Sequence, residues 1–178
     1  MTDDVDPSKI KEYGVSIPLT ELLLDTDNPR LYAKRRSGNL IDLQPEIQAD
    51  LLLKPSARPL KRSILHDGLR EAIYVQYRPD LQKYVVIEGN TRAAIHKQII
   101  ANGEVSETIP DMSFNEIQSH IVKQEVPQSE LSVMKVIWQT GKAEWGKCER
   151  AMLMHEQHHD FGFPIADIAV HSLKDMEW

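Results

Sequence analysis

The sequence predicts an α+β fold, and three observations support that prediction. Two runs rich in strand-forming residues, 73–77 and 83–87, are separated by the turn residues Arg78-Pro79-Asp80, as in a β-hairpin. The second run leads through Gly89 into a helical pattern over 93–100. The second half of the chain then carries mainly helical patterns. We therefore expect a mixed lobe followed by a helical segment.

The segments before the hairpin alternate between extended and helical patterns. The expected elements are a strand over 15–19, a helical turn over 21–24, a turn over 25–30 and helices over 45–53 and 57–65. Pro29 favours the turn because it biases the preceding Asn28 away from the helical conformation. Gly68 marks the end of the second helix, because glycine tolerates the left-handed backbone that commonly closes one.

The segments after the hairpin are expected to be helical. Asn102 and Gly103 end the helix that follows the hairpin, and Ser113 with Glu116 has the spacing of a capping box. The expected helices lie over 114–124, 131–138, 147–159 and 165–171. We expect a division into a lobe over 13–110 and a helical segment over 111–178.

Composition excludes several classes of protein. The chain has 178 residues and a net charge of −6, with no apolar run long enough to span a membrane. Its acidic beginning lacks the pattern of a signal peptide. A single cysteine, Cys148, excludes a disulfide framework and is expected to be a buried core thiol in a cytoplasmic protein. The acidic charge argues against non-specific nucleic-acid binding by the whole chain, but not against a local basic patch.

The junction between the second hairpin strand and the next helix is the strongest candidate site. Unpaired backbone N–H groups and the helix dipole at a helix N-terminus favour an anion, above all a phosphate. Gly89 allows close approach of the backbone, Asn90 and Thr91 add donors, and Arg92 adds a guanidinium fork. The alternative is purely structural, with Gly89 as a turn residue and Asn90 as an N-cap.

Two further segments are weaker candidates when each is taken alone. Ser63-Ile64 with Gly68 also fits an ordinary capped helix, and Asn28-Pro29-Arg30 also fits an ordinary turn. The basic run Lys34-Arg35-Arg36 follows Arg30 and favours a solvated loop over a phosphate contact.

Three of these segments, in their order and spacing, resemble the N-terminal domain of the ParB family, in the superfamily that includes sulfiredoxin. They are Asn28-Pro29-Arg30, Ser63-Ile64 with Gly68, and Gly89-Asn90-Thr91-Arg92. The family pattern has an N-P-x-R-like turn, a helix ending S-I-x-x-x-G, a hairpin, and G-x-x-R opening a helix. The resemblance covers about 17–103, and Glu88-Gly89-Asn90-Thr91-Arg92 is similar to a ParB-like branch with E-G-N-R-R, Thr91 replacing the first arginine. It implies an N-terminal lobe with a small mixed sheet.

The resemblance continues into the second half. Residues 138–151 are similar to the entry of the ParB central helical domain, and 159–169 to the first helix of its helix-turn-helix. The sequence ends at Trp178, before a complete recognition helix. The resemblance therefore implies an incomplete helix-turn-helix. Either the sequence is part of a longer protein, through which DNA is the expected partner, or the domain has lost its DNA-reading helix.

The resemblance also implies a ligand and a function. The ParB fold binds CTP, and relatives use the cleft for ATP-dependent phosphoryl transfer, so the expected ligand is CTP or ATP, with or without Mg²⁺. The phosphate-binding residues would be Gly89, Asn90, Thr91, Arg92, Arg30, Gly68 and Ser63. The expected function is nucleotide binding with DNA, in partition, plasmid or mobile-element biology. The alternatives are a DNase or phosphotransferase in which Glu88 is catalytic, and a non-catalytic, homodimerising adaptor.

The sequence departs from the family pattern at two places. The family's E-N-x-x-R motif corresponds to 138–142 here, where the carboxylate is absent, so Mg²⁺-dependent hydrolysis of CTP is not implied. Sulfiredoxins place a catalytic cysteine after the motif glycine, where this chain has Asn90, and an amide cannot act as a thiolate nucleophile.

Two features of the helical half have separate interpretations. Residues 155–159 match HExxH, the two-histidine pattern of zinc proteases, but the chain shows no clear third-ligand motif. Chance occurrence of so short a motif is therefore the favoured explanation, and no metal site is expected. Trp138 and Trp145 are expected to pack in a core.

Overall fold

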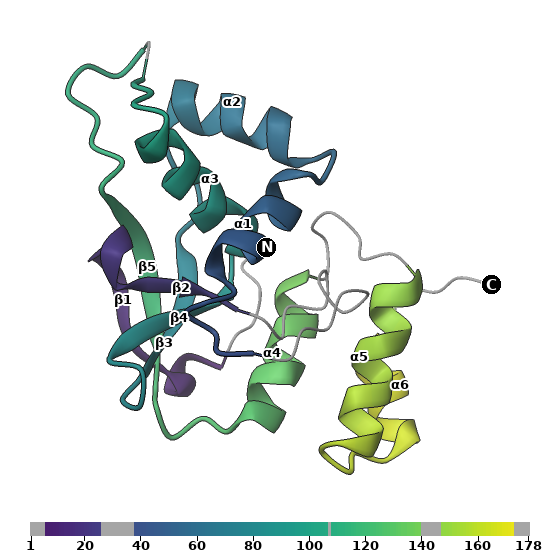
Figure 1. The fold of residues 1–178 in the computed structure, drawn as a ribbon. Helices are drawn as coiled ribbons and strands as arrows, with labels where there is room; N and C mark the ends of the chain where they lie inside the picture. Colours follow the sequence, from purple (N-terminus) through teal and green to yellow (C-terminus); the bar gives the residue numbers. More distant parts are fainter. Residues whose placement is uncertain (1–5, 26–37, 107, 140–146, 173–178) are drawn as a thin grey trace.

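A mixed five-stranded sheet forms the centre of the fold (Figure 1). The structure is a computed structural model and describes residues 6–25, 38–106, 108–139 and 147–172. The strands are β1 (Ile10–Pro18), β2 (Leu22–Leu24), β3 (Ile73–Arg78), β4 (Lys83–Glu88) and β5 (Glu116–Val122). Their order across the sheet is β1-β5-β3-β4-β2. The pairs β1–β5 and β3–β4 are antiparallel, while β3–β5 and β2–β4 are parallel, so the expected α+β fold with a small mixed sheet is confirmed.

The predicted hairpin is confirmed as β3 and β4. Tyr77 lies opposite Tyr84, and their rings meet edge to face at a centroid distance of 5.2 Å. The turn is held by Arg78, whose guanidinium donates to both carboxylate oxygens of Asp80 at 3.2 Å. Because alternate residues of a strand point to opposite faces, β3 supplies Ile73 and Val75 to one face and Tyr74 to the other.

Helices cover both faces of the sheet. The elements are α1 (Gln44–Leu52), α2 (Ala57–Asp67), α3 (Asn90–Ala101), α4 (Gln128–Gln139), α5 (Lys147–His159) and α6 (Ile165–Ser172). Helices α1 and α3 pack on the face that carries Ile73 and Val86, and α2 packs on α3. Helix α4 covers the face that carries Tyr74 and Ile87.

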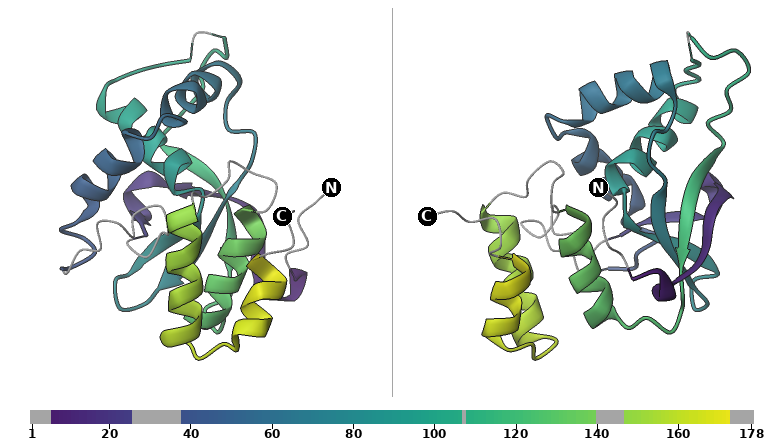
Figure 2. Two further views of the ribbon diagram at one scale, coloured as in Figure 1. Left: turned by 90° about the vertical axis from the view of Figure 1, so that its right-hand side faces the viewer. Right: turned by 180° about the vertical axis from the view of Figure 1, so that it is seen from behind.

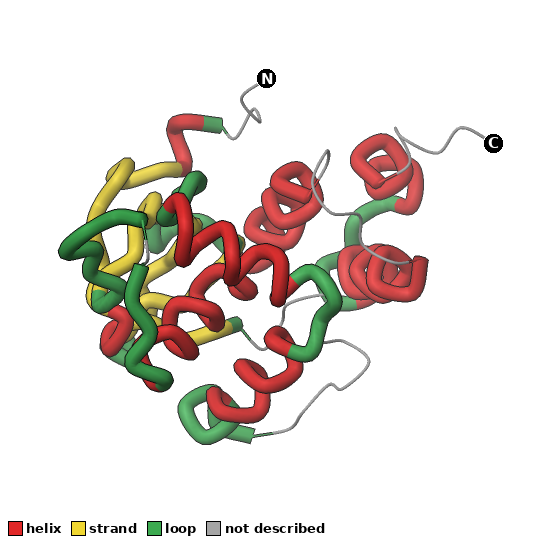
Figure 3. Tube along the Cα trace, turned by 90° about the horizontal axis from the view of Figure 1, so that it is seen from above, coloured by secondary structure: helices red, strands yellow, loops and turns green. Residues whose placement is uncertain are grey.

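Figure 2 shows α5 and α6 beyond α4, away from the sheet, and Figure 3 shows the strands together at one side of the molecule. Helix α6 contacts both α4 and α5. The helices predicted over 131–138, 147–159 and 165–171 are confirmed as α4, α5 and α6, with α4 beginning three residues earlier. Trp138 is buried, as predicted, against the face of the sheet that α4 covers. Among the described residues, no helix combines the length and apolar character that crossing a membrane requires.

The predicted helix over 114–124 is wrong, because residues Glu116–Val122 form the strand β5. Ser113 does not cap a helix; its hydroxyl accepts from the backbone N–H of Asn115 at 3.3 Å in a local turn. Ile117, Ser119 and Ile121 are buried at period two, which is the pattern of a strand. β5 lies between β1 and β3, so the sheet includes residues after 110.

Two predictions near the N-terminus also need correction. The strand expected over 15–19 begins at Ile10, because pairing with β5 extends from Pro18 opposite Glu116 to Ile10 opposite Val122, with two register shifts between Ile10 and Val15. The helical turn expected over 21–24 is instead a 3₁₀ turn at Leu19–Glu21 followed by β2. β2 pairs in parallel with β4, and this pairing buries all three of its leucines.

Candidate functional site

The turn between β4 and α3 requires a glycine. Gly89 has a φ of +91°, in the left-handed region. A Cβ at this position would lie 2.4 Å from Cγ2 and 2.9 Å from Cβ of Ile73, which is buried in the sheet. Any other residue would therefore strain the backbone and collide with the core. The chain consequently leaves β4 and enters α3 within a single residue.

Within the described ranges, no side chain caps the N-terminus of α3. Gly89 is the N-cap, and the first helical hydrogen bond runs from the N–H of Ala93 to the carbonyl of Gly89 at 3.0 Å. The N–H groups of Asn90, Thr91 and Arg92 precede that bond and have no acceptor within the helix. Three backbone donors at the positive end of a 12-residue helix form a setting that suits an anion.

Asn90 is the first residue of α3, and the interpretation of it as the N-cap is wrong. Its side-chain oxygen accepts from the N–H of Asp25 at 2.8 Å, and its side-chain nitrogen donates to the carbonyl of Val86 at 3.1 Å. The amide is buried and joins the end of β2 to β4 and α3. Its observed role is to hold the turn in place. Thr91 beside it is also buried.

Arg92 connects the turn to the loop before β3. Its guanidinium donates to the carbonyls of Glu71 at 2.7 Å and Ala72 at 3.2 Å, and to the carboxylate of Glu71 at 3.3 Å. It also pairs with the carboxylate of Glu88. Arg92 is 9% exposed. The guanidinium that was expected to face phosphates thus has protein acceptors in this structure, so a phosphate contact would require part of this network to open.

Glu88 is the last residue of β4, and its side chain is 6% exposed. Its carboxylate lies against Arg92, beside the first turn of α3. A catalytic acid or base must reach the reacting group, so Glu88 could act on a substrate only after this ion pair opens. Its catalytic role stays a prediction.

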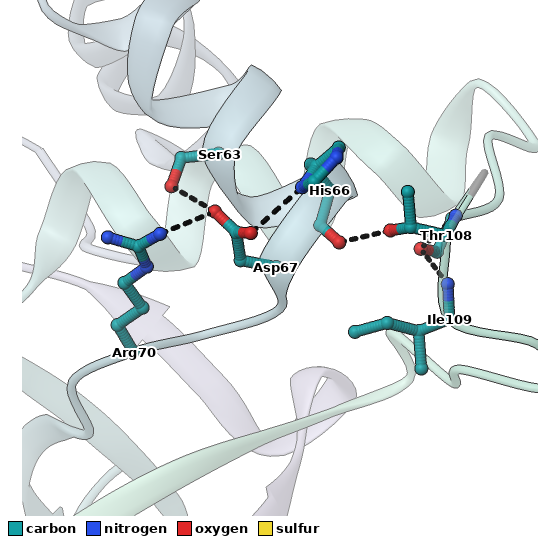
Figure 4. A network of polar contacts seen from close by, with 7 residues as sticks. Ser63, His66, Asp67, Arg70, Thr108 and Ile109 are labelled. Atoms are coloured by element: carbon teal, nitrogen blue, oxygen red, sulfur yellow. Dashed lines mark hydrogen bonds and ion pairs between the residues drawn. The ribbon is translucent and has the colours of Figure 1, made fainter.

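Ser63 lies on α2 near its end (Figure 4), and Gly68 directly follows that helix. Gly68 follows the helix with a φ of +78°, confirming the predicted glycine end, and a Cβ there would lie 2.5 Å from Cε of Met112. Ser63 donates to Asp67 at 3.3 Å. The pKa of Asp67 is lowered, first by its hydrogen bond with His66 and then by Arg70.

The structure brings some of the predicted site residues together. Gly68 begins the loop whose later residues, Glu71 and Ala72, accept from Arg92, so this loop and the α3 turn are in direct contact. The described hydrogen bonds of Ser63 stay within α2 and do not reach that turn. Arg30 and Lys34-Arg35-Arg36 lie outside the described residues, as do 140–146, which include Trp145.

The sequence analysis missed an ion pair beside the turn. Nζ of Lys135 on α4 lies 2.7 Å from Oδ2 of Asp25, and the two side chains are 8% and 9% exposed. A signal for it is present in the sequence, since Lys135 lies four residues after Leu131 and three before Trp138, on the apolar face of the helix. A lysine at such a position needs a buried partner.

The histidines of α5 form no complete metal centre among the described side chains. The rings of His155 and His159 stack at a centroid distance of 4.2 Å, and His158 lies edge-on to His159 at 5.0 Å. His158 also contacts the carbonyl of Phe163 at 2.9 Å. Within the described ranges, no three histidine, cysteine or acidic side chains are grouped to hold a metal ion. Cys148 lies on α5, and the prediction of its burial stays open.

A cavity of about 260 Å³ opens at the opposite end of the hairpin strands from Gly89. Its lining includes Lys11, Tyr77, Tyr84 and Gln124. None of the predicted site residues lines it.

The comparisons with known proteins give structural neighbours only. No protein-family model and no curated protein matches the sequence. The fold is similar to the C-terminally truncated chromosome-partitioning protein ParB from Caulobacter crescentus in two crystal structures. The one complexed with CTP-gamma-S has a TM-score of 0.47 and 16% identity, over 89% of this chain and 69% of that chain. The one complexed to the centromeric parS site has a TM-score of 0.45 and 16% identity, over 90% and 65%. This chain thus spans about two thirds of the length of either neighbour.

Proposed function

We propose that this protein binds a nucleoside triphosphate, CTP or ATP, at the turn between β4 and α3, and acts with DNA as a ParB-like protein in partition, plasmid or mobile-element biology. Support comes from the ordered motifs of the sequence and from the local geometry of α3. The E-G-N-R-R-type branch is the proposed place within that family.

One observation carries the proposal. Gly89, with its left-handed backbone, leads into a helix whose first N–H groups are capped by no side chain among the described residues. Ser, Thr, Asp or Asn usually satisfies such groups, and here glycine occupies the N-cap position instead. Phosphate oxygens would supply the acceptors, and the helix dipole would favour their negative charge.

The buried side chains around the turn make it rigid before the ligand arrives. Asn90 fixes the turn to β2 and β4, and Arg92 fixes it to the loop that follows Gly68. In the proposed complex the backbone N–H groups bind the phosphates first. Arg92 then contributes by positioning the loop, or by exchanging Glu71 for a phosphate oxygen, because the carboxylate of Glu71 belongs to an exposed residue.

The proposed action with DNA depends on the helical half. Helices α5 and α6 are joined by a short turn that contains Gly162, and α6 would be the first helix of the helix-turn-helix. A recognition helix from a longer protein would complete the DNA-reading unit. Homodimer formation is part of the same proposal.

Calorimetric titration of the protein with CTP, ATP and GTP, each with and without Mg²⁺, tests the proposal. We expect saturable binding of one nucleotide, weakened in Arg92→Ala. Arg78→Ala is the matched control, since Arg78 also pairs with an acidic residue but lies in the turn at the other end of the hairpin. Thermal unfolding of each variant separates loss of binding from loss of folding. A folded Arg92→Ala variant with unchanged affinity would contradict the assignment.

A further inference from the structure

The buried ion pair between Asp25 and Lys135 joins two distant parts of the chain. Asp25 directly follows β2, and Lys135 lies 110 residues later on α4. Their side chains are 9% and 8% exposed, and the charged atoms are 2.7 Å apart. Burying two charges costs solvation free energy that can exceed their mutual attraction, so such a pair is weak evidence for a stabilising role alone.

The pair lies beside the proposed phosphate site. β2 runs parallel to β4, with Leu24 opposite Val86, so both strands end at the same edge of the sheet. The N–H of Asp25 donates to the side chain of Asn90, the first residue of α3, at 2.8 Å. Asp25 therefore joins two helices: its backbone N–H binds Asn90 of α3, and its carboxylate binds Lys135 of α4. The ammonium group of Lys135 is therefore brought close to the N-terminal turn of α3.

Charge would favour a bound triphosphate over the Asp25 carboxylate as the partner of Lys135. A carboxylate carries one negative charge, whereas a triphosphate carries several and offers more acceptor oxygens. A triphosphate at the N-terminus of α3 would repel Asp25 and attract Lys135. Lysine suits such an exchange, because its ammonium is a point charge on a flexible chain, with no fixed fork to realign.

We propose that Lys135 is a further phosphate-binding residue of this site, supplied by α4 and held by Asp25 until the nucleotide binds. The inference rests on the proposed nucleotide function. It also assigns a consequence to binding, because Lys135 shares α4 with Leu131, Met134 and Trp138, which anchor that helix on the sheet. Movement of Lys135 from Asp25 to a phosphate would couple the ligand to the position of α4, which in turn contacts α5 and α6.

Nucleotide affinity in two opposed variants tests this inference. Lys135→Met removes the charge while keeping the apolar stem, and affinity for the nucleotide that the wild-type protein binds should fall roughly tenfold or more. Asp25→Asn removes the competing carboxylate, and affinity should rise severalfold. If the ion pair were only structural, neither variant would bind the nucleotide more tightly than the wild-type protein. Inorganic triphosphate should show the same order of affinities, because the proposed contact is to phosphate alone.

Two controls make the outcomes separable. Lys61→Met breaks another 2.7 Å lysine–carboxylate pair, between α2 and Glu104, and should leave affinity unchanged. The double variant Asp25→Asn/Lys135→Met removes both charges of the pair, and in folded form, checked by thermal unfolding, it should bind as weakly as Lys135→Met. Wild-type affinity in the folded double variant would overturn the role of Lys135 while leaving nucleotide binding intact. Absence of nucleotide binding by the wild-type protein would overturn both the function and this inference.

Discussion

Glu88 and Arg92 form a buried ion pair across the turn that joins β4 to α3. The same guanidinium binds the backbone carbonyls of Glu71 and Ala72. One side chain therefore connects the end of a strand, the beginning of a helix and the loop before β3. The backbone around the proposed phosphate site is thus held in place by the protein alone, before any ligand binds.

Truncation of Arg92 is expected to lower stability strongly. Arg92→Ala leaves the Glu88 carboxylate buried without its partner, and removal of one member of a buried pair costs about 3–5 kcal/mol. Urea unfolding measures the change. In a double-mutant cycle, Glu88→Ala/Arg92→Ala should cost clearly less than the sum of the two single variants. Simple additivity would show that the two side chains are not coupled.

Gly89→Ala is expected to destabilise the protein more than Gly103→Ala. Both glycines have a positive φ, so alanine strains the backbone at both positions. A Cβ at Gly103 meets nothing within 4 Å, whereas at Gly89 it collides with Ile73. The difference between the two variants isolates that collision and should be about 1–3 kcal/mol in the free energy of unfolding. Equal costs would contradict the observed contact with Ile73.

Local patterns in the sequence were sufficient for the hairpin, the Gly68 helix end and the strand–glycine–helix turn. Each depends on residues close together in the chain, so turn chemistry and periodicity predict it. β5 was missed because the local Ser113 signal favoured a helix, while the strand is stabilised by β3 and β1, whose paired residues lie 46 and 98–112 positions away. The acceptors of Arg92 and the partner of Lys135 were missed for the same reason, since no local pattern identifies a partner brought in by the fold. The position of Lys135 on the apolar face of its helix signals only that a partner is needed.

Stability is expected to fall as the pH falls below about 6.5. Burial lowers the pKa of both His96 and His120 from their ordinary value of 6.5. Below that pH the unfolded chain takes up protons that the folded protein resists, so the free energy of unfolding decreases until the lowered folded pKa values are passed. Above it both states are neutral and these two groups contribute no slope.

Urea unfolding at several pH values measures this dependence. Nδ1 of His120 accepts from the N–H of Gly14 at 3.0 Å, so protonation of that nitrogen would also remove a hydrogen bond. His120→Gln should therefore flatten part of the decline and leave the part that comes from His96. An identical pH profile in His120→Gln and the wild-type protein would contradict the contribution of His120.

Trp138 is expected to anchor α4 through packing alone. Its ring stacks on Tyr74 at a centroid distance of 4.2 Å, and its buried Nε1 has no hydrogen-bond partner within the described structure. Trp138→Phe keeps an aromatic ring and loses no hydrogen bond, whereas Trp138→Ala leaves a cavity and should cost about 3–5 kcal/mol. Thermal unfolding of both variants should show the larger loss for alanine, and equal losses would contradict this packing role.

Calorimetric titration with CTP, ATP and GTP most directly tests whether the N-terminus of α3, where glycine is the N-cap, binds a nucleotide. We predict saturable binding of one of these nucleotides, with weaker binding in the folded Arg92→Ala and Lys135→Met variants. Absence of binding by any of the three, with and without Mg²⁺, to a protein whose cooperative unfolding shows it to be folded would contradict the claim.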